Sequence, residues 1–366
     1  MERKLASVQR ILDIQPIDGA DKIVKAQING WWVVTAKDNG FNVGDLVIYL
    51  EIDSWVPHGI APFLSKGKEP REFEGVQGER LRTIRLRGQL SQGMILPLVD
   101  YILPEFEDEL PAVFNGTDYL VLPEEGDDVT EFLGILKWEA PINAQLQGKV
   151  RGNFPSYLRK SDQERAQNLV RDIFEKHKGE HYEATMKLDG SSMTVYYYND
   201  GTEVRKGVCS KNMDLDLNQE GNTFVDTAKR LGLLETLEKF GMNIALQGEL
   251  MGPGIQKNRE NLKEHDFYLY NIFDIDNQKF VNPDVRSNIM FGIYLKTKLN
   301  LKHVPHVADA KTLSDLGITD LDGLLEQSNN LPSINHEFAE GIVYKSYDSG
   351  FQFKVISNKY LEKEKD

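Results

Sequence analysis

Residues 181–198 read HYEATMKLDGSSMTVYYY, two strand-like runs joined by a short turn. Side chains alternate between the two faces of a strand, so Lys187 and Asp189 share one face where the first run ends. Gly190 follows them, and a glycine lets the backbone turn tightly against a ligand. Residues 187–190 alone are typical of many surface turns, so their meaning depends on the rest of the chain.

The segments around this turn predict an α+β domain over residues 146–366. The strand-like runs IALQGEL, FYLYNIFDI, EGIVYKS and FQFKVI follow the turn, and residues 223–240 have helical spacing. Residues 161–178 predict an amphipathic helix, because Ser161 and Glu164 form a capping-box pattern ahead of apolar residues at helical spacing. Strands in succession with few helices favour a mainly antiparallel sheet.

Residues 5–98 are short β-rich segments separated by Gly, Asp and Asn, which predicts a small β-barrel. The segment resembles an OB-type barrel, a fold that binds oligonucleotides. One predicted strand carries Arg80, Arg82, Arg85 and Arg87 on both of its faces. These arginines are either solvated residues on the rim of the barrel or contacts to an RNA backbone.

The chain has 366 residues, which favours two domains. The acidic stretch 104–128, with the segment after it, predicts the connection between a domain of residues 1–145 and a domain of residues 146–366. A net charge of −14 argues against a protein that coats nucleic acids through a broad basic surface. With one cysteine and no apolar run of membrane-spanning length, a cytoplasmic protein with no membrane partner is expected.

Five further segments occur in order along the chain: VCSKN (208–212), LQGELMG (246–252), FYLYNIFDI (267–275), AEGIVYKS (339–346) and FKVISNKYL (353–361). With residues 187–190 they resemble the nucleotide-binding motifs of covalent nucleotidyltransferases, and most closely those of ATP-dependent RNA ligases with an N-terminal OB-like domain. The resemblance implies that Lys187 takes AMP from ATP and passes it to an RNA 5′-phosphate. A 3′-hydroxyl then seals the strand, a reaction expected in RNA repair.

A lysine attacks a phosphate only as the neutral amine, and with a pKa of about 10.4 roughly one in a thousand is neutral near pH 7.4. A cation beside it lowers that pKa. Lys354 and a divalent metal, Mg²⁺ or Mn²⁺, are expected to do so for Lys187. A hard cation takes oxygen ligands, and the candidates are Asp189, Glu249 and Glu340.

The resemblance assigns further residues to the site. Phe273 matches the aromatic residue that stacks on the purine, although such a strand also needs core residues. Arg165 and Lys345 would contact phosphates, and Lys211 stands where the family more often has arginine. Gln352 precedes Phe353 and Lys354 where relatives tend to carry a second lysine. The residues expected to bind the nucleotide are Lys187, Gly190, Arg165, Lys211, Phe273 and Lys345.

Two alternative functions remain. A DNA ligase or a capping guanylyltransferase of the same superfamily typically carries a C-terminal OB domain, whereas only 12 residues follow Lys354 here. A non-catalytic RNA-binding protein with a decayed transferase domain is disfavoured by the intact lysine, aspartate and glutamates.

Two pairs of histidines have spacings that metal ligands use, namely His177 with His181 and His303 with His306. Neither pair has an obvious third ligand, so neither predicts a metal site. Cys209 has no histidine partner nearby and is expected to be an inert strand residue.

Overall fold

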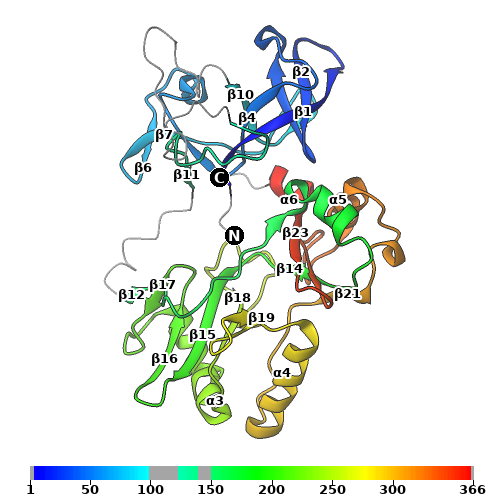
Figure 1. The fold of residues 1–366 in the computed structure, drawn as a ribbon. Helices are drawn as coiled ribbons and strands as arrows, with labels where there is room; N and C mark the ends of the chain where they lie inside the picture. The colour runs from blue at the N-terminus through cyan, green and yellow to red at the C-terminus, as the bar shows by residue number, and fades with distance from the viewer. Residues whose placement is uncertain (1–3, 99–122, 139–149, 364–366) are drawn as a thin grey trace, which may run out of the picture. The chain divides into compact units, whose positions relative to one another are not determined.

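The computed structural model describes residues 4–98, 123–138 and 150–363 (Figure 1). Their contacts form two compact units, one of residues up to Pro141 and one from Ile142 onward, each with its own hydrophobic core. The predicted boundary at residue 145 lies outside the described residues. Within those ranges, no helix has both the length and the apolar character needed to cross a membrane.

The amino-terminal unit consists of two β-sheets and a hairpin. The five-stranded sheet has the order β10-β4-β1-β2-β3, and its strands are β1 (Ala6–Ile17), β2 (Ala20–Ile28), β3 (Trp31–Ala36), β4 (Leu46–Leu50) and β10 (Met94–Pro97). The four-stranded sheet has the order β11-β5-β7-β6, with β5 (Ser54–Pro57), β6 (Arg71–Phe73), β7 (Val76–Arg80) and β11 (Leu136–Lys137). Strands β8 (Ile84–Leu86) and β9 (Gln89–Ser91) form the hairpin.

Strand β1 curves the first sheet. Its first half pairs with β4, its second half pairs with β2, and the register shifts between Ile11 and Asp13. Such a bulge bends a strand and increases its twist, which allows the sheet to wrap around the buried residues Val8, Ile48 and Leu50.

Residues 123–138 belong to this unit, so the interpretation of this part of the chain as a connection is wrong. Val129, Leu133 and Ile135 are buried in the same core as β1 and β4, and Leu136 pairs with Trp55. Burial of three apolar side chains holds this segment against the sheets. The rest of the predicted connection, residues 104–122 and 139–145, lies outside the described residues.

The four arginines do not share one strand. Strand β7 ends at Arg80, whose guanidinium pairs with Asp53 at 2.6 Å and lies 3.8 Å from the ring centroid of Trp138. Arg85 lies in β8, and Arg87 lies at the turn of the hairpin with a positive φ of 51°. Of these four arginines, only Arg85 and Arg87 of the hairpin are exposed.

The carboxy-terminal unit contains two larger sheets, in which the strand pairs between described residues are antiparallel except β13 with β23. The seven-stranded sheet has the order β12-β17-β16-β15-β18-β19-β20, with β12 (Val150–Asn153), β15 (Ser191–Asn199), β16 (Val204–Cys209), β17 (Met213–Leu215), β18 (Ile244–Met251), β19 (Asp266–Asp274) and β20 (Lys279–Phe280). The five-stranded sheet has the order β13-β23-β22-β14-β21, with β13 (Glu164–Arg165), β14 (Tyr182–Lys187), β21 (His306–Lys311), β22 (Gly341–Ser346) and β23 (Gln352–Ile356).

Helices cover the outer faces of these sheets (Figure 1). They are α2 (Thr223–Arg230), α3 (Leu233–Phe240), α4 (Pro283–Thr297), α5 (Leu321–Asn330) and α6 (Asn358–Lys363). Leu237 of α3 and Ile293 of α4 are buried with Val195 and Leu246 of the seven-stranded sheet. Tyr182, Leu324 and Phe353 lie in the core of the five-stranded sheet.

The helix predicted for residues 161–178 is wrong in its first half. Glu164 and Arg165 form β13 and pair in parallel with Phe353 and Lys354. Ala166–Asn168 then form a short 3-10 turn, and Asp172–Lys176 form one wide helical turn. The Ser161 hydroxyl accepts a hydrogen bond from the Asn271 side chain at 2.6 Å instead of capping a helix. Pairing with a distant strand has overridden the local pattern.

Residues 223–240 form two helices instead of the single predicted one, because Gly232 between them has a φ of 64°. The prediction missed α4 and α5. A signal for α4 was present, since Asn282 caps it by accepting from the Val285 amide at 2.9 Å and Pro283 stands at the first turn.

Candidate active site

Lys187 and Glu340 face each other across two paired strands. Lys187 is the last residue of β14 and pairs with Gly341, the first residue of β22. Glu340 directly precedes β22, and its Oε1 lies 2.7 Å from the Lys187 amine. The Lys187 side chain keeps 28 % of its surface exposed.

Glu249 enters the same cluster from β18. The turn after Lys187 lies directly against this strand, because a Cβ on Gly190 would fall 2.5 Å from the Leu250 carbonyl oxygen and 2.8 Å from Cγ of Glu249. Real Cβ atoms do not approach so closely, so only glycine fits at position 190. The glycine thus contributes by letting the turn approach Glu249.

The three charged groups shift one another's pKa. Burial raises the pKa of Glu249 to about 8, against the attraction of Lys187. Burial also raises the pKa of Glu340. For Lys187, burial favours a lower pKa, but Glu340 and Glu249 outweigh it and hold the pKa above its ordinary value.

Lys354 therefore does not give Lys187 the lowered pKa that we expected. Its amine donates to Oδ1 of Asp162 at 3.0 Å, while its positive charge lowers the pKa of Glu340. The carboxylates control the Lys187 amine in this arrangement. A cation that draws charge from them would lower the pKa of Lys187.

Arg165 lies beside Lys354, which the sequence did not indicate. The two residues are partners in the parallel pairing of β13 with β23, and Arg165 is buried. Two cationic side chains on neighbouring strands form a group that suits a phosphate. Asp162, which pairs with Lys354, is a further residue that the sequence analysis missed.

Arg259 is another residue that the sequence analysis missed. It contacts both Asp189 and the segment that precedes β22. Its Nη1 lies 3.8 Å from Oδ2 of Asp189, and its Nη2 donates to the Phe338 carbonyl at 3.1 Å. Its guanidinium also lies over the rings of Phe338 and Tyr360, 4.9 Å and 4.8 Å from their centroids. A lone arginine in the polar loop 252–265 gave no signal in the sequence.

Lys345 lies between the two sheets. Its amine is buried and donates to Oδ1 of Asn271 at 2.8 Å and to the Tyr270 carbonyl of β19. Burial, together with the charge of Arg286, lowers its pKa to about 7. These contacts tie β22 to β19, and the phosphate contact expected of Lys345 stays a prediction.

The structure corrects the interpretation of Phe273. Its ring is fully buried, packs edge-on against Phe280 at 5.2 Å, and belongs to a core cluster with Tyr196 and Ala245. No part of the ring is available for stacking on a base. Tyr270, on the same strand, is the aromatic residue near the cluster, since its hydroxyl lies 3.0 Å from Ser192 and the charge of Glu249, after burial, raises its pKa.

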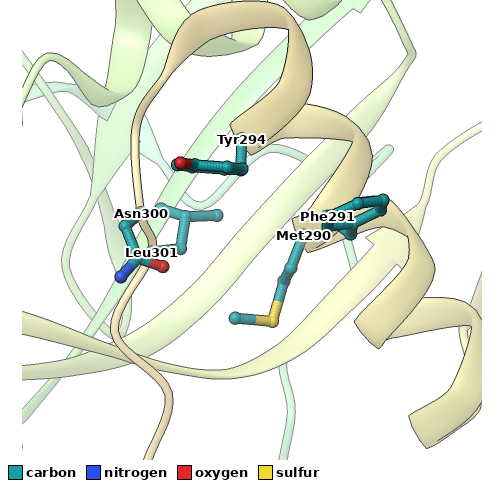
Figure 2. Close-up of a pocket in the computed structure, with 5 residues that line it drawn as sticks. All are labelled: Met290, Phe291, Tyr294, Asn300 and Leu301. Carbon is teal, nitrogen blue, oxygen red and sulfur yellow. The ribbon is translucent and has the colours of Figure 1, made fainter.

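The described residues also include the predicted site residue Lys211 and a surface pocket. Lys211 is exposed in the turn between β16 and β17. A surface pocket of about 390 Å³ is lined by Met290, Phe291 and Tyr294 of α4 with Asn300 and Leu301 (Figure 2). None of the predicted site residues lines it.

The carboxylates suit a hard divalent cation. Asp189, Glu249 and Glu340 offer only oxygen donors, and two of them have raised pKa values because burial and their neighbours disfavour their charge. The ligand atoms of these three carboxylates do not all lie within 4.8 Å of one another. Among the described residues, only one other set of potential metal ligands is that compact. One or two carboxylates would therefore hold the ion, with phosphate oxygens and water completing its shell.

Comparison with known proteins defines the class of this fold and site. Residues 5–98 match a family described as an OB-fold domain, and residues 180–361 match a family described as RNA ligase. No match was found among curated proteins.

Solved structures of the Naegleria gruberi RNA ligase are similar over nearly the whole chain. A mutant with AMP and Mn shares 40% identity with a TM-score of 0.84, covering 98% of both chains. A mutant with ATP and Mn shares 39% identity with a TM-score of 0.83, covering 98% of both chains. The form with PPi shares 40% identity with a TM-score of 0.84 and 99% coverage of both chains.

The chain belongs to the RNA ligase family. The predicted family is confirmed, as is the predicted fold of an OB-type domain followed by a sheet-rich ligase domain with helices.

Proposed function

We propose that this protein is an ATP-dependent RNA ligase that joins 3′-hydroxyl and 5′-phosphate ends in RNA repair, with Lys187 as the residue that takes up AMP. The observation that carries the proposal is the Lys187 amine 2.7 Å from Glu340, at the end of β14 and within the influence of Glu249 and Asp189. Relatives solved with ATP, AMP and PPi support the choice of nucleotide.

In the proposed first step, the Lys187 nitrogen attacks the α-phosphate of ATP. A nitrogen–phosphorus bond forms, the bond to the β-phosphate oxygen breaks, and pyrophosphate leaves. The amine must first lose a proton, and Glu340 is the acceptor at hydrogen-bond distance. AMP then passes to the RNA 5′-phosphate, and the 3′-hydroxyl displaces it.

Glu249 and Glu340, with Asp189 through water, would hold Mg²⁺ or Mn²⁺. Such an ion would offset phosphate charge and draw the carboxylates away from Lys187, which would let the amine lose its proton. Lys354, whose charge acts on Glu340, and Arg165, in register with it on β13, would contact the phosphates.

We further propose that residues 1–145 engage RNA while residues 146–366 carry the chemistry. All the clustered candidate residues lie after residue 160. In the amino-terminal unit, Arg85 and Arg87 are exposed on the β8–β9 hairpin, whereas Arg80 is occupied by Asp53 and Trp138. The hairpin arginines are therefore the better candidates for RNA contacts.

Incubation with ATP labelled at the α-phosphate tests the proposal. We expect label on the denatured protein, no label from GTP, and no label on Lys187→Ala or Lys187→Arg, because arginine is not usefully neutral. Labelling by GTP would instead indicate a capping enzyme. Sealing of RNA ends but not DNA ends then separates an RNA ligase from a DNA ligase, and an unlabelled folded protein would refute the proposal.

A further inference from the structure

Three side chains with metal-binding atoms meet next to β14. They are Glu183 of β14, His303 in the loop before β21, and His306 at the start of β21. One potential ligand atom from each lies within 4.8 Å of the others. This is the only such group among the described residues, and Glu183 is the third ligand that the sequence did not reveal for the histidine pair.

His303 presents a buried lone pair. Its Nδ1 lies 2.7 Å from the Val304 carbonyl oxygen, which can only accept, so the proton is on Nδ1. The unprotonated Nε2 is buried and has no hydrogen-bond partner.

Glu183 presents a second acceptor with no donor. Its side chain is 1% exposed, and its Oε1 accepts from Nη2 of Arg286, whereas Oε2 is buried without a partner. Leaving a buried acceptor unsatisfied costs about 1–3 kcal/mol. A hydrogen-bond donor or a cation bound to these two acceptors would remove the cost of leaving them unsatisfied.

His306 connects the cluster to solvent. Its ring stacks on His303 with 4.7 Å between centroids, and its Nδ1 lies 3.5 Å from Oε1 of Glu183. Its side chain is 48% exposed. An ion can therefore enter past His306 and keep an open coordination position there.

We propose that Glu183, His303 and His306 form a zinc site separate from the carboxylate cluster around Lys187. Two imidazoles and one carboxylate are a donor set that Zn²⁺ accepts with a fourth position left for water. Mg²⁺ and Mn²⁺ prefer oxygen ligands, so they are poor occupants. The cation of Arg286, which already pairs with Glu183, limits the affinity without removing any of the three ligands.

Zinc bound at this site would stabilise the position of β14, the strand that ends at Lys187. Glu183 and Lys187 are four residues apart on one face of β14. The histidine segment pairs with the same strand, through Thr185 with His306 and through the Met186 amide to the Pro305 carbonyl at 2.8 Å. Bound zinc would add a link between these two segments.

Titration of the full-length protein with Zn²⁺ alone, after removal of metals and without any histidine tag, tests the proposal. We expect one equivalent to bind and raise the melting temperature, and Co²⁺ in its place to give the visible absorption of a four-coordinate site. His306→Ala should weaken binding at least about tenfold, a scale reached even by outer-shell changes at metal sites. Mg²⁺ should not compete.

His181→Ala is the matched control, because His181 is 54% exposed in the same unit and also pairs with a carboxylate. Equal zinc binding by the two histidine variants, or no stoichiometric binding by the unchanged protein, would overturn the proposal. The latter result would mean that a bridging water satisfies the two acceptors. Because neither ATP nor RNA is present, the outcome does not depend on the proposed ligase reaction.

Discussion

Arg259 links Asp189 to the chain immediately before Glu340: its Nη1 lies 3.8 Å from the Asp189 carboxylate, and its Nη2 donates to the Phe338 carbonyl. One side chain therefore contacts both Asp189 and the segment that leads to Glu340. We interpret Arg259 as a positioning residue.

Replacing Arg259 by Met should slow adenylylation about tenfold or more while leaving the KM for ATP almost unchanged, because a small displacement of positioning groups mainly affects the reaction step. Single-turnover labelling measures the rate. Arg259→Lys should recover part of it by restoring the charge near Asp189. The control is Arg171→Met, whose side chain is 81% exposed. A loss of thermal stability with an unchanged rate would assign Arg259 a purely structural role.

Glu340→Gln should change the pH profile of adenylylation as well as its rate. Glu340 is the carboxylate that most raises the pKa of Lys187, so its loss should lower that pKa and move the alkaline rise of the rate to lower pH. The maximal rate should fall about a hundredfold. Rates measured across pH, with Glu326→Gln of α5 as control, test both effects. An unmoved profile would show that Glu340 does not set the ionisation of Lys187.

Glu249 should make the folded protein less stable as the pH rises. Its pKa is about 8 when folded and about 4.5 when unfolded, so across that interval the folded protein keeps a proton that the unfolded chain releases. The stability is thus largest below pH 4.5 and is lost as the pH rises through 8. Glu249→Gln cannot ionise, so in buffer with a chelator its melting temperature should exceed that of the unchanged protein more at pH 8 than at pH 5. A constant difference would contradict the raised pKa.

Phe273→Leu should affect stability and not nucleotide use. The ring is fully buried, so the loss of packing should cost about 1 kcal/mol of unfolding free energy. The KM for ATP should stay the same. Chemical denaturation of this variant measures the stability, and adenylylation kinetics measure the KM for ATP. A large rise in KM with unchanged stability would instead support a base-stacking role for Phe273.

Charge reversal at Arg85 and Arg87 should weaken RNA binding and make it less dependent on salt. Each lost phosphate contact lowers the slope of log affinity against log salt by about one. Self-adenylylation should be unaffected. Arg10→Glu, at another exposed position of the same unit, provides the control. If the doubly reversed protein binds RNA with the original slope, the hairpin does not contact the backbone.

The sequence predicted the cluster of Lys187, Asp189, Glu249 and Glu340 because each residue lies in or beside a strand with a recognisable motif. The resemblance of these motifs, in this order, to those of a known family was the reason to expect these strands to converge. The base-stacking role of Phe273 was wrong, because a strand buried on both faces near its end leaves no exposed aromatic there.

Other features could not be predicted because they depend on contacts between distant segments. Arg259 meets Asp189 from a polar loop, and Glu183 joins His303 from a strand 120 positions earlier in the chain. The helix expected at residues 161–178 failed for the same reason, since the partner of Arg165 is Lys354. Local sequence patterns do not indicate such pairings.

The hydrogen bond from Lys354 to Asp162 spans 192 positions, and β13 pairs with β23 at the same place. Contacts between such distant residues form late, because a long loop must close before they are made. Arg165 and Lys354 are therefore brought together only after the chain between them has folded, and separation of β13 from β23 would part the two cations.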